Sequence, residues 1–133
     1  MGNTVKITVI GAVVFMVLDG VWLGMLMKDF YRDQLAPIVR LVDGGIAPNW
    51  PAALMVYLLL GAGIALFVIP GAATLGSAAV RGGLLGLVVY GVYDFTNYST
   101  LRQWPFALVL VDVAWGTAAT AVCSATVRLL VRS

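Results

Sequence analysis

The sequence contains no histidine and no glutamate, and its only cysteine is Cys123. A lone cysteine cannot close a disulfide within the chain, and without histidine the usual zinc ligand is missing. We therefore expect no metal site and no cofactor. Charge is scarce as well, because eight Lys and Arg against six Asp give a net charge of +2. So few and so dispersed positive charges exclude a nucleic-acid partner.

Hydrophobic residues take the place of the missing polar ones. They make up 62% of the 133 residues, and only 11% are charged. The mean hydropathy is +1.00. A water-soluble globule of this size needs a more polar surface, so the solvent that fits this composition is a lipid bilayer.

Four apolar runs are long enough to cross a bilayer, at about residues 7–27, 50–69, 82–101 and 104–130. They predict an all-α polytopic membrane protein, a single transmembrane domain with no separate soluble part. An even number of spans puts both termini on one side. Positive charges are nearly balanced between the two sides, and we take the side of the termini to be the cytoplasm.

The connection from 28 to 49 is the longest polar stretch, and its apolar residues recur at helical spacing between Tyr31 and Val42. This pattern predicts a short amphipathic helix on the membrane surface after the first span. Pro37 in its middle predicts a kink or a break. An ordinary linker with one amphipathic turn is the alternative.

Two segments of the chain recur in the same order. Residues 13–19 match 88–94, and residues 49–54 match 103–108. Together they predict a duplicated helical hairpin, with the amphipathic connection as an insertion in the first copy. Because each copy crosses the bilayer twice, the copies should be parallel and related by a pseudo-twofold axis along the membrane normal. Asp19 and Asp94 would then face each other across this axis.

Three aspartates, Asp19, Asp94 and Asp112, interrupt the apolar spans. An Asp near the centre of a span costs roughly 2.5–3.5 kcal/mol, so three of them in a small protein indicate an inward-facing, functional site. Each lies eight to ten residues from a charge on the side of the long connection, which corresponds to roughly 12–15 Å at the helical rise. We therefore expect all three at one depth, titrating as one coupled system.

Large and polar side chains accompany these aspartates at helical spacing. In Asp19-x-x-Trp22 and Asp112-x-x-Trp115 an indole N–H could donate to a carboxylate one turn away or across the bundle. An alternative is that these polar groups only hold helices together in lipid. The candidate pocket residues are Asp19, Trp22, Asp94, Asn97, Tyr98, Asp112 and Trp115.

Small residues recur at four-residue spacing in two spans, as Gly20-x-x-x-Gly24 and Gly82-x-x-x-Gly86. Such spacings allow helices to approach closely. They indicate either packing within one chain or a homo-oligomer.

Five short motifs are distributed along the whole chain. They are Asp19-x-x-Trp22-Leu23-Gly24, Phe30-Tyr31-Arg32, Asn49-Trp50-Pro51, Tyr93-Asp94-Phe95-Thr96-Asn97 and Asp112-x-x-Trp115-Gly116. In these motifs the chain resembles an uncharacterised bacterial family of membrane proteins, domain of unknown function 2177. The resemblance covers nearly the whole chain and implies a four-span protein of the bacterial inner membrane, but no activity.

The residues favour a membrane-embedded, aspartate-lined pocket that binds or acts on a lipid or isoprenoid-like molecule. One alternative is a small proton- or cation-coupled transporter, in which the same carboxylates take up a proton or cation on one side of the membrane and release it on the other. Another is a non-catalytic partner subunit of a larger membrane enzyme. Whether the chain is an enzyme is left open by the sequence.

Overall fold

The computed structural model describes residues 2–132, and within them four long helices have the length and composition to cross a membrane. This confirms the all-α, four-span fold. The helical elements in chain order are α1 (Gly2–Val21), η1 (Trp22–Leu26), α2 (Lys28–Leu35), α3 (Trp50–Gly63), η2 (Ile64–Val68), η3 (Ile69–Gly71), α4 (Leu75–Thr100) and α5 (Phe106–Val131). The π-helical η1 and η2 continue the first and second spans, and α2 lies in the long connection.

The ends of the spans follow capping signals in the sequence. Asn49 caps α3 through its side chain, and Pro51 stands in the first turn. The third span begins at Leu75 instead of near Gly82, because Thr74 and Ser77 form a reciprocal capping box there. The last helix begins at Phe106, so Trp104 lies in the turn before it.

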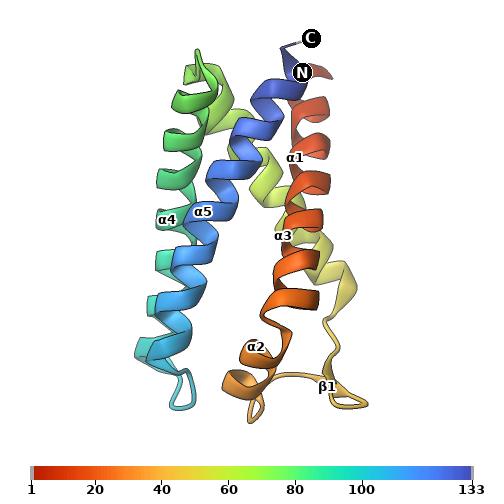
Figure 1. Cartoon of the computed structure of the whole chain (residues 1–133), viewed down its shortest axis with the longest axis vertical. Coiled ribbons are helices and arrows are strands. Elements are labelled where there is room, and N and C mark those ends of the chain that lie inside the picture. The colour runs from red at the N-terminus through yellow and green to blue at the C-terminus, as the bar shows by residue number, and fades with distance from the viewer. Residues whose placement is uncertain (1, 133) are drawn as a thin grey trace.

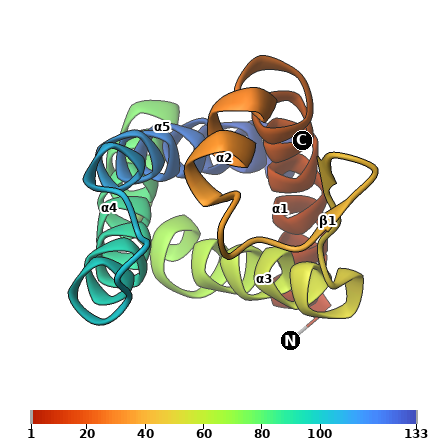
Figure 2. The same cartoon turned by 90° about the horizontal axis from the view of Figure 1, so that it is seen from below.

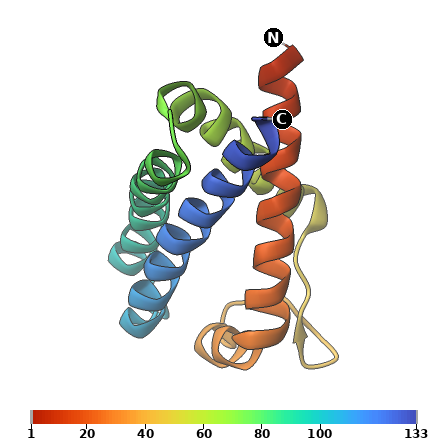
Figure 3. The same cartoon turned by 45° about the horizontal axis from the view of Figure 1, so that its top comes forward.

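The spans form two antiparallel pairs, α1 with α3 and α4 with α5 (Figure 1). The helices α1 and α4 run in one direction and α3 and α5 in the other, and the first and last described residues lie at one end, here called the terminal end. These directions are those that a parallel repeat requires, although the repeat itself stays a prediction. The helix α5 meets α1 near the terminal end and diverges from it toward the other end, here called the connection end (Figure 3).

Glycines permit the close approach within each pair. A side chain at Gly61 would collide with the α1 backbone at Thr8 and Ala12. Gly82 and Gly86 meet α5 in the same way, at Ser124, Thr120 and Gly116. This glycine spacing therefore serves packing within one chain. By contrast, a side chain at Gly20 or Gly24 would meet no atom of the described chain within 4 Å outside its own stretch of helix, and the homo-oligomer stays a prediction.

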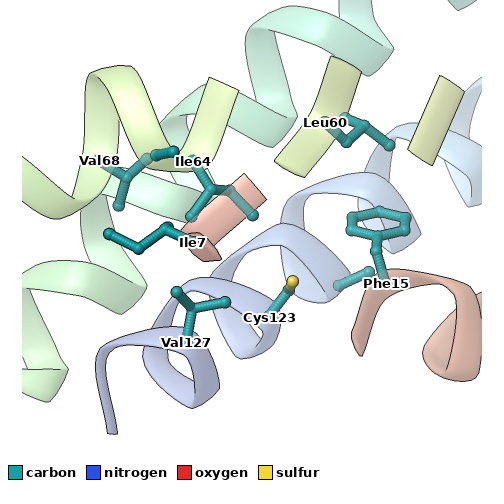
Figure 4. Close-up of a cluster of buried hydrophobic side chains, with 9 residues drawn as sticks. Ile7, Phe15, Leu60, Ile64, Val68, Cys123 and Val127 are labelled. Atoms are coloured by element: carbon teal, nitrogen blue, oxygen red, sulfur yellow. The ribbon is translucent and has the colours of Figure 1, made fainter. Parts of the chain in front are cut away.

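A buried apolar cluster fills the bundle toward the terminal end. Phe15, Ile64 and Cys123 have no exposed surface, and they pack together from three different spans (Figure 4). Ile7, Val68 and Val127 continue the cluster (Figure 4). This half of the bundle is held by close packing of apolar side chains.

The long connection differs from its expected form. The helix α2 spans Lys28–Leu35, so it begins and ends earlier than the predicted 31–42, and it stops before Pro37, whose ring is incompatible with a continuing helix. A small hairpin follows, in which β1 (Leu41–Val42) pairs antiparallel with β2 (Gly45–Ile46). Its turn is Asp43-Gly44, with φ of 52° and 77°, as two-residue hairpin turns require. The helix α2 lies across the connection end of the bundle (Figure 2).

Candidate aspartate site

Asp19 lies near the end of α1 and is only 8% exposed. Its Oδ1 accepts a hydrogen bond from Trp115 Nε1 on α5 at 2.8 Å, and its Oδ2 accepts one from the Tyr57 hydroxyl on α3 at 3.1 Å. Both oxygens of this carboxyl group are thus paired with neutral donors, one from each of two other spans. Asp19 therefore joins three helices.

Asp112 on α5 is half-buried, and its donor comes from outside the spans. The hydroxyl of Tyr31, the one buried residue of α2, donates to Asp112 Oδ1 at 2.8 Å. The same hydroxyl accepts a hydrogen bond from Trp22 Nε1 at 3.2 Å. Burial, together with the nearby charge of Asp112, raises the pKa of Tyr31, so its hydroxyl stays protonated and keeps donating at neutral pH.

The two D-x-x-W motifs interlock across the bundle. Because α1 and α5 run in opposite directions, the tryptophan of each motif lies beside the aspartate of the other. The rings of Trp22 and Trp115 stack with centroids 4.4 Å apart and an interplanar angle of 1°. Trp115 donates directly to Asp19, and Trp22 reaches Asp112 through the Tyr31 hydroxyl. The donors thus come from across the bundle and not from one turn along the same helix.

Asp94 on α4 is fully buried, yet neither of its carboxyl oxygens has a hydrogen-bond partner among the described residues. The Asp112 carboxyl and the Trp104 indole are close enough to interact with it. The Trp104 Nε1 is also buried and forms no hydrogen bond in the described chain. Asp94 therefore has a second carboxyl group and one indole N–H beside it, but no contact among the described residues has the geometry of a hydrogen bond to its oxygens.

The sequence predicts that Asp19 and Asp94 face each other across the pseudo-twofold axis, and this stays a prediction. Both aspartates interact electrostatically with Asp112 on α5. The helix α5 packs against α4 and also contacts α1, so Asp112 is the neighbour that the two aspartates share.

Tyr90 on α4 lies between the apolar cluster and the three aspartates with their donors, here called the polar cluster. Its ring covers Gly116, where any side chain would collide with it. It also stacks on Phe15, with centroids 6.4 Å apart. Its hydroxyl is within electrostatic range of the cluster members Asp19, Tyr31, Tyr57 and Asp112. Tyr90 thus separates the polar cluster from the apolar half of the bundle.

The remaining predicted pocket residues divide between two places. Asn97 is half-buried and lines a pocket at the connection end, whereas Tyr98 is 48% exposed and packs against Phe106. This pocket, here called the interfacial pocket, has a volume of about 620 Å³. Its lining residues are Ile38, Tyr93, Asn97, Leu101, Arg102, Gln103 and Trp104.

Three members of the site are not predicted by the sequence, and the reasons differ. The spacing around Tyr31 predicts a surface helix, and Trp104 lies where the sequence predicts the start of the fourth span. Tyr57 has no signal other than being a lone polar side chain in an apolar span. Tyr90, by contrast, lies four residues before Asp94, on the same predicted helix face.

Within residues 2–132, no Lys or Arg forms a salt bridge with any of the three aspartates. The salt bridges within residues 2–132 both belong to Arg32, which pairs with Asp29 and Asp33 on the surface of α2. The described chain also holds no group of three side chains placed to bind a metal ion. The arrangement is suited to accepting hydrogen bonds or a cation from a bound molecule.

These features define a polytopic α-helical membrane protein with an aspartate cluster between its spans. Residues 4–129 match the family described as predicted membrane protein (DUF2177), and the chain belongs to this family. The resemblance drawn from the motifs is thereby confirmed. No curated protein and no solved structure matches the chain.

Proposed function

We propose that this protein binds the polar head of a lipid or isoprenoid-like molecule at its aspartate cluster. The observation that carries the proposal is the pair Asp94 and Asp112, two neighbouring carboxyl groups inside the bundle with no cation beside them in the described chain. Trp104, which interacts with Asp94, also lines the interfacial pocket.

The three aspartates differ in how well they are satisfied, which separates structural from functional roles. Asp19 has a donor on each oxygen and Asp112 has one donor, but Asp94 has none. A buried polar group without a partner costs free energy that helix packing alone does not require. Asp19 therefore supports the bundle, and Asp94 with Asp112 offers acceptors to a ligand.

Access from one side favours binding over transport. The polar cluster lies toward the connection end, and the apolar cluster around Phe15, Ile64 and Cys123 fills the bundle toward the terminal end. A coupled transporter would need a polar path through this cluster. In a bacterial inner membrane with both termini in the cytoplasm, the interfacial pocket faces the periplasmic leaflet.

Mass spectrometry of lipids that copurify with the full chain tests the proposal. We expect a bound lipid in the wild type. In Asp112→Asn we expect the amount of bound lipid per protein to be about tenfold lower, because the amide lacks the carboxylate charge. Asp43→Asn is the matched control, because Asp43 lies in the exposed hairpin turn and Asn also adopts positive φ. Equal lipid loads in both variants, with unchanged thermal unfolding, would contradict a binding role for the cluster.

A further inference from the structure

The interfacial pocket lies between groups of opposite charge. Arg102, in the turn between α4 and α5, lines it and forms no ion pair within residues 2–132. Asp94 is eight residues away, on the order of 12 Å at the helical rise. An extended arginine side chain and a ligand group that carries a phosphate and an ammonium a few bonds apart can together bridge the distance between Arg102 and Asp94.

Two aromatic residues form the wall shared by the pocket and the carboxyl pair. The Trp104 ring lines the pocket, and its indole interacts with Asp94. Tyr93 also lines the pocket, packs edge-on against Trp104 at 5.8 Å, and lies within electrostatic range of Asp94 and Asp112. Asp94 and Asp112 do not line the pocket, so contact between a ligand in the pocket and the carboxyl pair requires the Tyr93 side chain, which is 55% exposed, to move aside.

From this arrangement we infer that the ligand is a phospholipid whose headgroup carries a primary ammonium, the chemistry of an ethanolamine phosphodiester. This inference rests on the proposed function and specifies its ligand class. The phosphate lies at Arg102, whose guanidinium recognises phosphate oxygens through paired N–H groups. The ammonium lies at Asp94 and Asp112.

A primary ammonium is favoured over the other common headgroups by the hydrogen bonding of Asp94. Its two oxygens lack donors in the described chain, and an ammonium supplies three N–H groups. A trimethylated ammonium has none and would leave the oxygens unsatisfied, although aromatic rings attract it. A glycerol headgroup brings hydroxyl donors but no positive charge.

A membrane lipid is favoured over a free phosphodiester because apolar groups accompany the charges. Ile38 and Leu101 line the pocket. Phe106 and Tyr98, at the adjoining ends of α5 and α4, expose 48% of their surfaces to the surrounding lipid. Acyl chains can therefore leave the pocket along the helices.

The inference is tested by native mass spectrometry of the full chain, titrated with dihexanoyl lipids that carry ethanolamine, choline or glycerol headgroups. We expect the ethanolamine lipid to bind about tenfold or more tightly than the other two, as one charge-assisted hydrogen bond implies. Soluble glycerophosphoethanolamine should bind more weakly than the lipid. Equal affinities for the three lipids would overturn the inference, and equal binding of the soluble compound would overturn the assignment to a lipid.

Two variants separate the contacts. Asp94→Asn should remove the preference for ethanolamine, and Arg102→Gln should weaken all three lipids by a similar factor. Arg40→Gln is the control, because Arg40 is exposed in the connection and does not line the pocket. If Asp94→Asn fails to fold, the comparison of headgroups on the wild type still tests the ammonium preference, and the same comparison on Arg102→Gln still tests the phosphate contact. Unchanged lipid binding in Arg102→Gln would contradict the phosphate contact.

Failure of the inference and failure of the proposed function give different results. Lipids that bind without headgroup preference, but are lost in Asp112→Asn, would refute only the ammonium assignment. Binding of no lipid, or binding that no aspartate variant changes, would refute the proposed function as well.

Discussion

Neutral donors hold the Asp19 carboxyl, and they reach it from α3 and α5. In a bilayer, a hydrogen bond between spans stabilises modestly, because unassembled helices also find partners. A hydrogen bond to an ionised carboxylate is stronger than one to a neutral acceptor. The contribution of Trp115 is therefore measurable.

We expect Trp115→Phe to destabilise the bundle by about 1–2 kcal/mol. The phenyl ring retains part of the stack on Trp22 but has no N–H for Asp19. Unfolding by denaturing detergent in bicelles measures the change. Trp50→Phe is the matched control, because Trp50 is 61% exposed at the start of α3.

Combining Trp115→Phe with Asp19→Leu tests the assignment of the bond. The effects of the two substitutions should be less than additive, because leucine has no acceptor and phenylalanine has no N–H, so each substitution removes the same interaction. Additive effects would show that Trp115 acts through packing alone.

At the scale of single residues, the sequence indicated the carboxyl groups and the tryptophan donors, but not which tryptophan donates to which carboxyl group. Asp19, Asp94 and Asp112 were recognisable because a charge inside an apolar run is costly. The D-x-x-W spacing left open whether a donor acts along its helix or across the bundle. That choice depends on α1 and α5 being antiparallel neighbours, which no local pattern in the sequence determines.

At the scale of the helices, α3 and α1 approach closely at Gly61, where an added side chain would meet the α1 backbone at Thr8. We expect Gly61→Ala to destabilise the protein by about 1–3 kcal/mol, because the added methyl group forces the two backbones apart. Gly91→Ala is the control, because no atom outside its own helix turn lies within 4 Å of the added group. This control should be neutral or stabilising by about 0.5–1 kcal/mol, since alanine favours a helix more than glycine does.

The same unfolding measurement in bicelles compares the two glycine variants. A Gly61→Ala protein as stable as Gly91→Ala would contradict the close approach of α1 and α3.

The limits of the elements were predictable where a residue dictates them locally. Pro37 indicated a break, and α2 ends before it. The Asp43-Gly44 pair is a strong hairpin signal that the helical spacing of the neighbouring apolar residues had obscured. The docking of α2 through Tyr31 depends on tertiary contacts, so its amphipathic pattern predicted a surface helix but not its attachment to the site.

For the whole molecule, the separation into a polar and an apolar half predicts access from one side only. The Asn97→Cys substitution introduces a thiol in the interfacial pocket. This thiol should react with a membrane-impermeant maleimide that is added to sealed vesicles on the side where the connection end of the bundle faces the solution. Asn3→Cys, exposed at the terminal end, should react from the opposite side. The native Cys123 is fully buried and should stay unlabelled in both variants.

Labelling of Asn97→Cys from both sides would contradict one-sided access and favour the transport alternative. The comparison uses folded full-length protein, and the unreactive Cys123 reports that the bundle remains closed.

The bond between Asp19 and Trp115 joins residues 96 positions apart in the chain, and this separation has a consequence for biosynthesis. At about 5–20 residues per second, roughly 5–20 s pass between the synthesis of the two residues. During that time the first span holds its carboxyl group in the insertion machinery or in lipid without its indole donor, and Tyr57 arrives first. Assembly of the polar cluster is therefore one of the last steps of biogenesis, and a chain truncated before α5 leaves an unfinished bundle for membrane quality control to remove.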